Sequence, residues 1–343
     1  MERVASVADL EGVIGSRPLG ALLKSIDALD GHCVQLLGLS PCAVLGFRES
    51  GGRPRAAVLG GPPGFARVES PGRLRVPLPE SGAPEPGSPA ALLFLVPGLG
   101  ETLRINGRVQ GDGDLRIEVE EAFVHCAKAL IRSALWAGGA PPEGAVKPAA
   151  GTGALADPEI AAFLARAPFA VIASCDASGG ADASPKGDPA GFVVLAGGAT
   201  VAVPDRPGNR RTDTFHNLLD RPATAIVALV PGDGRTLELS GRASLSREPA
   251  LLAAMAVHGK VPKLAMVLDV ELARLAPSAA LAAADLWKAP RADRSALPRM
   301  ATVWTDHVKL NKQRGLAATA MRKLANARLI GKAIDRDYET NLY

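Results

Sequence analysis

The chain contains two copies of one sequence motif. Residues 95–108 (LVPGLGETLRINGR) align with residues 229–242 (LVPGDGRTLELSGR), and nine of the 14 positions are identical. Upstream, residues 60–65 (GGPPGF) match residues 187–192 (GDPAGF), and downstream Leu135-Trp136 matches Leu286-Trp287. Because the three matches occur in the same order, we expect the chain to fold as two homologous domains.

The repeat also sets the expected domain boundaries. Two domains of about 140 residues each can bury separate hydrophobic cores. Residues 139–156 are rich in Gly and Pro and have no periodic pattern, which is typical of a linker. We therefore expect a degenerate first domain at 1–138, a linker at 139–156, a second domain at 157–289 and a basic helical extension at 290–343.

Each copy is expected to be mainly β. The chain has 37 Gly and 28 Pro, which favours many turns and short strands. Strands of this kind close naturally into a small antiparallel barrel. In the second copy we predict strands at 170–174, 191–195, 200–203, 224–229 and 236–243 and helices at 157–164 and 211–220; the extension is predicted to be helical from 302 to 334, with a break near Gly315.

Composition limits the expected location and partners. The longest apolar runs are far shorter than the roughly 20 residues of a membrane-spanning helix, and the N-terminus does not read as a secretory signal, so we expect a cytoplasmic protein. Four scattered cysteines and five unclustered histidines predict no metal site. Residues 291–343 carry 11 Lys or Arg against 5 Asp or Glu, which we interpret as a solvated helical face and not as a nucleic-acid or membrane surface.

Two segments of the second copy carry a family resemblance. Ser184-Pro-Lys-Gly187, followed by residues 204–214 (PDRPGNRRTDT), resembles the pyridoxamine 5′-phosphate oxidase-like, FMN-binding split-barrel family. Residues 125–136 (HCAKALIRSALW) of the first copy look like a later segment of the same family. The resemblance implies a six-stranded split barrel, usually dimeric, with FMN in a groove between two barrels.

The residues of the second copy suit a phosphate independently of the resemblance. A flavin phosphate is bound by clustered cations, hydroxyl donors and a close backbone. Gly187 and Gly208 would let that backbone approach. The predicted phosphate-binding residues are Ser184, Lys186, Arg210, Arg211 and Thr214.

The two copies have lost different parts of this site. The first copy has Ala57 and Leu59 where the second has Ser184 and Lys186. Conversely, the first copy keeps cationic and polar residues that the second replaces with Ala279, Ala283 and Ala284. We therefore predict two tandem split barrels that form an intramolecular pseudo-dimer with one composite FMN site, closed by first-copy residues Lys128, Arg132, Ser133 and Trp136.

Flavin would carry the redox chemistry of such a site. We expect an FMN-dependent oxidoreductase that acts on an unidentified small molecule, compatible with a nicotinamide electron donor, and we assign no catalytic residue. Glu101, Arg104 and Asn106 are candidates for lining the groove. The alternative is a non-catalytic flavin- or haem-binding protein of the same fold, with His258 or His307 as haem ligand. Oligomerisation is allowed but is not required to complete the site.

Overall fold

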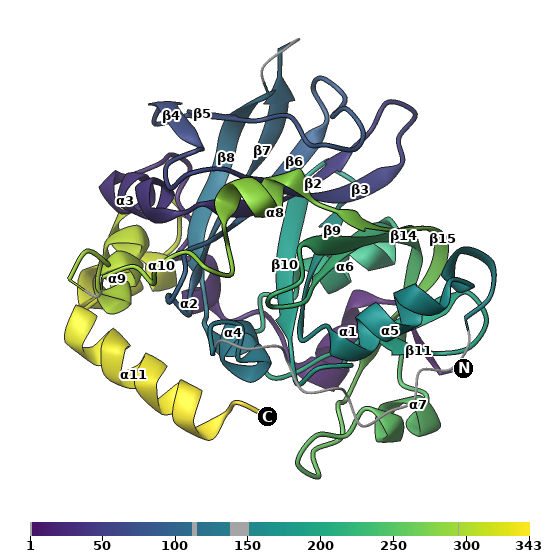
Figure 1. The fold of residues 1–343 in the computed structure, drawn as a ribbon. Helices are drawn as coiled ribbons and strands as arrows, with labels where there is room; N and C mark the ends of the chain where they lie inside the picture. Colours follow the sequence, from purple (N-terminus) through teal and green to yellow (C-terminus); the bar gives the residue numbers. More distant parts are fainter. Residues whose placement is uncertain (1, 112–114, 138–150, 294) are drawn as a thin grey trace.

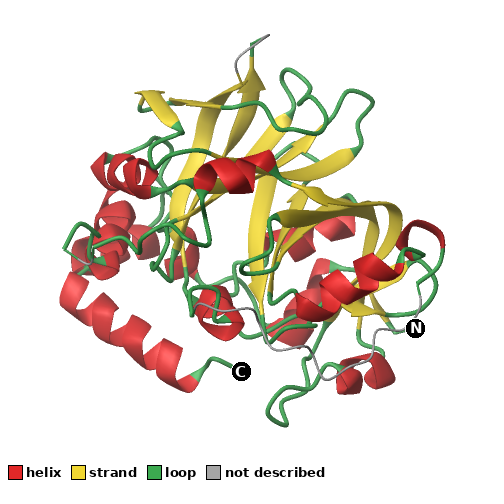
Figure 2. Ribbon diagram, viewed as in Figure 1, coloured by secondary structure: helices red, strands yellow, loops and turns green. Residues whose placement is uncertain are grey.

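The computed structural model describes residues 2–111, 115–137, 151–293 and 295–343. Most of the predicted linker, residues 139–150, lies outside the described residues. The rest of the chain forms two antiparallel sheets with helices around them (Figures 1 and 2).

Both sheets have the same strand order, which confirms a mainly β fold of the split-barrel type. The first sheet runs β3-β2-β6-β7-β8-β5-β4 and the second runs β10-β9-β13-β14-β15-β12-β11. The strands of the first sheet are β2 (Cys42–Arg48), β3 (Pro54–Gly60), β4 (Arg67–Ser70), β5 (Arg73–Val76), β6 (Pro89–Leu95), β7 (Thr102–Gln110) and β8 (Leu115–His125). Those of the second are β9 (Phe169–Cys175), β10 (Ala181–Gly187), β11 (Val194–Leu195), β12 (Thr200–Pro204), β13 (Ala223–Leu229), β14 (Arg235–Ser246) and β15 (Ala265–Pro277).

The helices lie between and around these strands. They are α1 (Val7–Ile14), α2 (Leu19–Leu22), α3 (Gly31–Leu39), α4 (Lys128–Ser133), α5 (Pro158–Arg166), α6 (Asp213–Asp220), α7 (Pro249–Ala254), α8 (Ala279–Ala284), α9 (Met300–Leu310), α10 (Leu316–Leu324) and α11 (Ala327–Thr340), with a 3-10 turn at Gly153–Leu155. Of the predicted strands, only 191–195 is mostly wrong, since a two-residue strand forms there.

A glycine kept in both copies of the repeat marks a matched irregularity. The register shifts at Asn106/Gly107 in the first sheet and at Ser240/Gly241 in the second. A Cβ placed on either glycine would lie 1.9 Å from a carbonyl oxygen of the neighbouring strand, that of Glu118 or Asp269. The bulge therefore excludes any side chain at these two positions.

The two sheets share an apolar interface in addition to their separate cores. Val44, Val58 and Leu93 of the first sheet belong to one buried cluster with Val171 and Val227 of the second. The sheets approach so closely that a Cβ on Gly46 would lie 2.5 Å from the Cβ of Ala173. This contact brings the ends of β10 beside the first barrel.

Both termini depart from the simple order of domains. The two-residue strand β1 (Arg3–Val4) pairs with β14, and Val4 and Leu10 are buried in the core of the second barrel. The C-terminal helix α9 returns to the first barrel, where Val303 enters the core. The sequence-based division at 1–138 did not anticipate this exchange.

The C-terminal extension is helical, as predicted, but has two breaks. Residues 311–315 separate α9 from α10, with Gly315 at a φ of 124°, and Asn326 caps the start of α11. Two leucines of the extension lie largely in solvent: Leu316 is 92% exposed and Leu324 is 77% exposed. Figure 1 shows α11 running along the outside of the fold, with the C-terminus near α4.

Within the described residues, no helix is both long enough and apolar enough to cross a bilayer. All four cysteines are buried free thiols.

Candidate functional site

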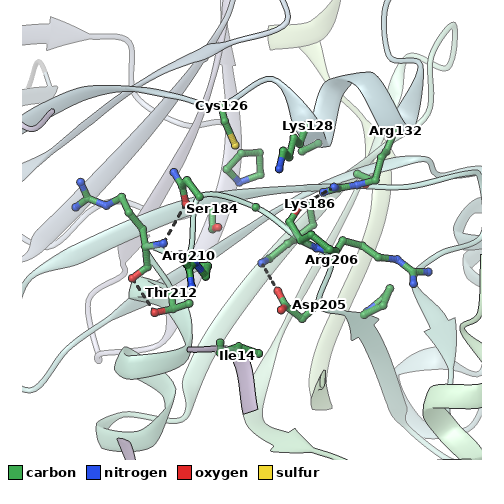
Figure 3. A pocket seen from close by; sticks show the side chains of 18 of the residues that line it. Ile14, Cys126, Lys128, Arg132, Ser184, Lys186, Asp205, Arg206, Arg210 and Thr212 are labelled. Carbon is green, nitrogen blue, oxygen red and sulfur yellow. Dashed lines mark hydrogen bonds and ion pairs between the residues drawn. The ribbon is translucent and has the colours of Figure 1, made fainter. Parts of the chain in front are cut away.

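A cavity of about 760 Å³ lies where the second barrel meets α4 of the first. Its walls come from β10, the loop after β12, the start of α6, α4 and the end of the C-terminal extension (Figure 3). Nine cationic side chains and five acidic ones line it, so the site favours an anion. The cationic residues are Arg104, Lys128, Arg132, Lys186, Arg206, Arg210, Arg211, Lys260 and Lys263.

Strand β10 supplies one wall through its alternating residues. Asp182, Ser184 and Lys186 are two residues apart and therefore share a face, and all three line the cavity. The ammonium of Lys186 lies 3.9 Å from Asp205 Oδ1, longer than a hydrogen bond (Figure 3). Burial lowers the pKa of Lys186 and raises that of Asp205. An anionic ligand would favour the charged form of Lys186 and disfavour that of Asp205.

The loop between β12 and α6 carries further donors. Arg210 lines the cavity with a positive φ of 54° and an exposed side chain. The side-chain amide nitrogen of Asn209, Nδ2, is buried and has no hydrogen-bond partner among the described residues. A buried donor without an acceptor is what a phosphate-binding loop leaves free for its ligand.

The guanidinium of Arg211 already has several protein partners. It donates to Glu121 Oε1 at 2.8 Å, Asp213 Oδ2 at 2.7 Å and Ser25 Oγ at 2.6 Å. It also stacks on Phe123, 3.9 Å from the ring centroid, and its pKa is raised by the two carboxylates. These contacts fasten the loop to the first barrel. Arg211 also lines the cavity, and its contact with a phosphate stays a prediction.

Thr214 is also committed to a protein partner. Its hydroxyl donates to Asp182 Oδ2 at 2.6 Å, and the other oxygen of Asp182 accepts from Arg104 of the first barrel. Arg104 and Asp182 are 1% and 2% exposed, which makes this a buried ion pair between barrels. Thr214 lines the cavity with its hydroxyl already bonded to Asp182, so its contact with a phosphate stays a prediction.

Of the four first-copy residues predicted to close the site, two, both on helix α4, lie at the cavity. Lys128 Nζ pairs with Asp337 Oδ2 at 2.8 Å, and Arg132 Nε donates to the carbonyl of Gly187 at 2.9 Å. Ser133 instead bonds to the carbonyl of Leu130 within its own helix. The indole of Trp136 donates to the carbonyl of Leu99, away from the cavity, so the prediction that Ser133 and Trp136 close the site is wrong.

Gly187 is needed for a different reason from the one predicted. A Cβ there would lie 2.0 Å from the carbonyl oxygen of Ala129 in α4. The glycine therefore lets two protein segments meet. At Gly208, by contrast, the only atom near an added Cβ is 3.8 Å away, so the structure imposes no such requirement.

The end of the C-terminal extension forms part of the site. Asp337, Asn341 and Tyr343 line the cavity, and Arg132 Nη1 donates to the carbonyl of Leu342 at 2.9 Å. The pKa of Tyr343 is raised to about 12, chiefly by burial.

The pseudo-symmetric positions on the other side carry inverted charges. Arg55 of β3 and Glu238 of β14 occupy the positions that Asp182 and Arg104 hold on the cavity side. Arg55 Nη2 donates to Glu238 Oε2 at 2.7 Å, and both residues are buried. The two barrels are thus joined by two ion pairs of opposite polarity.

The other groove candidates lie outside the cavity. Glu101 is buried and accepts from the hydroxyl of Tyr338 at 3.2 Å, and Asn106 donates to Glu121. Neither proposed haem ligand lines the cavity, because His307 is fully buried 3.3 Å from Asp30 and His258 packs on Tyr343.

Sequence reasoning missed three wall residues. His125 lines the cavity next to Arg104, and burial together with nearby cations holds its pKa well below the usual value. Arg206 is fixed by Asp188 at 2.7 Å. Asp182 could have been found, because it lies two residues before Ser184 on the same strand face.

The second barrel matches a known family. Residues 156–282 fit the sequence profile of the pyridoxamine 5′-phosphate oxidase family. Over these residues, the chain is similar to the pyridoxamine 5′-phosphate oxidase family. The matched span contains β9 to β15 and all five residues predicted to bind phosphate.

Solved structures of similar proteins each overlap about a third of this chain. HupZ from Group A Streptococcus is 21% identical over 33% of this chain and 88% of its own, with a TM-score of 0.28. An F420 reductase is 15% identical over 33% of this chain and 93% of its own, with a TM-score of 0.26. A putative pyridoxamine 5′-phosphate oxidase from Lactobacillus delbrueckii is 16% identical over 31% and 83%, with a TM-score of 0.25. No curated protein matches the chain.

Proposed function

We propose that the cavity between the barrels binds FMN and that the protein is an FMN-dependent oxidoreductase acting on a small molecule. The observation that carries the proposal is the meeting of Lys186 and the loop donor Asn209 from one barrel with Arg132 from the other at one cavity. Its volume lies within the range of about 300–1,000 Å³ typical of cofactor sites.

The donor set fits a flavin mononucleotide. Lys186, Arg210 and the unpartnered amide of Asn209 suit a phosphate, and Ser184 adds a hydroxyl. Lys128 would be available after exchange of its partner Asp337. Bound FMN would supply hydride or electron transfer, while the cationic wall would stabilise negative charge on the reduced ring.

The two barrels would then act as an intramolecular pseudo-dimer with one site. Ala57, Leu59, Ala279 and Ala283 stand at the positions that correspond to Ser184, Lys186, Lys128 and Arg132. These apolar side chains offer no phosphate contacts, which supports a stoichiometry of one FMN per chain.

The test is the absorption spectrum and cofactor content of the purified full chain. Flavin bands at about 375 and 450 nm and about one FMN per chain are expected, whereas a Soret band would favour the haem alternative. Lys186→Ala should weaken FMN binding roughly tenfold or more, because a charged phosphate contact is lost. Lys323→Ala, at an exposed lysine far from the cavity lining, is the matched control. Two FMN per chain, or unchanged binding by Lys186→Ala, would contradict the proposal.

Reduction by nicotinamide donors separates an enzyme from a carrier. Bleaching of the flavin bands by NADH or NADPH under anaerobic conditions, and their return in air, is the expected behaviour of an oxidoreductase. A flavin that no nicotinamide donor reduces would favour the non-catalytic alternative.

A further inference from the structure

A second hollow lies among the C-terminal helices. It is a groove of about 410 Å³ between α9, α10, α11 and the turn that follows α2. This volume is large enough for a small molecule. The groove is lined almost wholly by apolar side chains, chiefly Trp304, Val308, Met321, Leu324, Leu329 and Ile330.

Two of the residues that line this groove carry buried donors without acceptors among the described residues. Lys24 is 2% exposed, and its Nζ has no hydrogen-bond partner among the described residues. The ammonium lies 4.5 Å from the ring centroid of Trp304, whose buried indole Nε1 is also without a partner. Buried donors are almost always satisfied in folded proteins, so this pair indicates a missing acceptor.

The neighbouring acids are already engaged elsewhere. Asp337 pairs with Lys128 at 2.8 Å, and Glu101 accepts from the hydroxyl of Tyr338 at 3.2 Å. The aromatic faces of Trp304 and Phe123 favour the cationic form of Lys24 but give it no hydrogen bond. A ligand oxygen would complete both donors at once.

The outer part of the groove calls for an apolar ligand. Leu324 and Leu329 are 77% and 66% exposed, which is unusual for leucines beside one another on a folded surface. We propose that the groove binds a small amphipathic carboxylic acid, with its carboxylate on Lys24 and Trp304 and its hydrocarbon chain along α10 and α11.

The test compares three probes of equal chain length, decanoate, decanol and decylamine, by calorimetry on the full chain. Decanoate should bind at least tenfold more tightly than decanol, and decylamine should not bind detectably. Lys24→Met should weaken decanoate binding roughly tenfold or more and change decanol binding less than about twofold. Lys312→Met, at an exposed lysine that pairs with Asp27, is the matched control and should change neither.

A second variant tests the hydrocarbon part of the site. Ala333→Trp places a large ring on an exposed position of the groove lining and should abolish binding of decanoate and decanol alike. This result is readable even if Lys24→Met does not fold. Equal affinities for decanoate and decanol, undiminished decanoate binding by folded Lys24→Met, or retained binding by Ala333→Trp would overturn the proposal.

Discussion

Two buried cations of the first barrel have opposite surroundings. Arg104 is matched by Asp182, which in turn accepts from Thr214. Lys24 is just as deeply buried but has aromatic rings in place of a carboxylate. Removing one partner of a buried ion pair leaves an uncompensated charge and is strongly destabilising, whereas an unpaired buried charge costs stability as it stands. Mutations at the two residues should therefore change the free energy of unfolding in opposite directions.

Removing Arg104 alone should destabilise the protein strongly. Arg104→Met leaves Asp182 as an uncompensated buried carboxylate, for which we expect a loss of about 3–5 kcal/mol in the free energy of unfolding. The double variant Arg104→Met/Asp182→Asn removes the charge and keeps an acceptor for Thr214, so it should recover most of the loss. Urea unfolding of both variants measures the difference. Equal destabilisation by the single and double variants would show that the charge is not the cause.

Replacing Lys24 should stabilise the protein near neutral pH. Burial lowers the pKa of Lys24 from 10.5 to about 7, so the unfolded chain binds more protons between these two values. The stability of the wild type therefore rises with pH across this window, while that of Lys24→Met lacks this contribution. We expect Lys24→Met to be more stable by roughly 1–3 kcal/mol at pH 7 and the difference to shrink at about pH 9.5.

The comparison is made by urea unfolding at both pH values. Lys24→Met that is less stable than the wild type at pH 7 would show that the ammonium has a stabilising partner. The groups that act on this lysine are Arg104, Cys126, Arg211 and Asp213, and the lysine in turn acts on Glu101 and His125.

At the scale of elements, one close contact holds the cavity wall together. The end of β10 meets α4 where Gly187 faces the carbonyl of Ala129, and Arg132 of the same helix bonds to the carbonyl of Gly187. The corresponding contact on the other side is between Gly60 and the carbonyl of Ala280, 2.1 Å from an added Cβ. Each barrel therefore contacts the helix that follows the last strand of the other barrel in the same way.

Adding one methyl group at this contact should separate the strand from the helix. Gly187→Ala places the Cβ on backbone, which cannot rotate away, so we expect a loss of about 3 kcal/mol, at the upper end of overpacking costs. Gly208→Ala should change stability by less than about 0.5 kcal/mol, because the space around that residue is open. Thermal unfolding of both variants tests the contrast, and a neutral Gly187→Ala would mean that α4 can shift freely.

The sequence predicted the elements of the site better than the contacts within it. Ser184 and Lys186 could be predicted because strand alternation and local motif place them on one face. Arg211 and Thr214 looked equally suitable. Their partners, Glu121 on β8 and Asp182 on β10, are both distant from them in the sequence. Nothing local reveals which cation of a cluster is already paired across a domain interface.

At the scale of the whole molecule, the repeat predicted two barrels but not how the termini are shared between them. Identical residues in the two copies report on strand order and on the matched bulges at Gly107 and Gly241. The N-terminal segment has no counterpart in the second copy, so the repeat carries no information on where it packs. Its position follows from the pairing of β1 with β14 and from the burial of Val4 and Leu10 in the second core.

Removal of the first 14 residues should therefore destabilise the second barrel and leave the first barrel, which is nearer in the sequence, folded. The deletion exposes the pocket filled by Val4 and Leu10, for which we expect a loss of about 2–5 kcal/mol. It also removes Ile14 from the cavity wall. Hydrogen exchange should show faster exchange in β14 and β15 than in β7 and β8, and uniform acceleration across both sheets would contradict this assignment.

The inverted ion pairs have a consequence for the ancestry of the chain. If the first barrel paired with a copy of itself, Arg104 would face Arg55. If the second barrel did so, Glu238 would face Asp182. At these two buried positions, each barrel therefore repels a copy of itself and pairs with the other barrel of the same chain. Once these charges had diverged, separate barrels could no longer pair with copies of themselves across this interface.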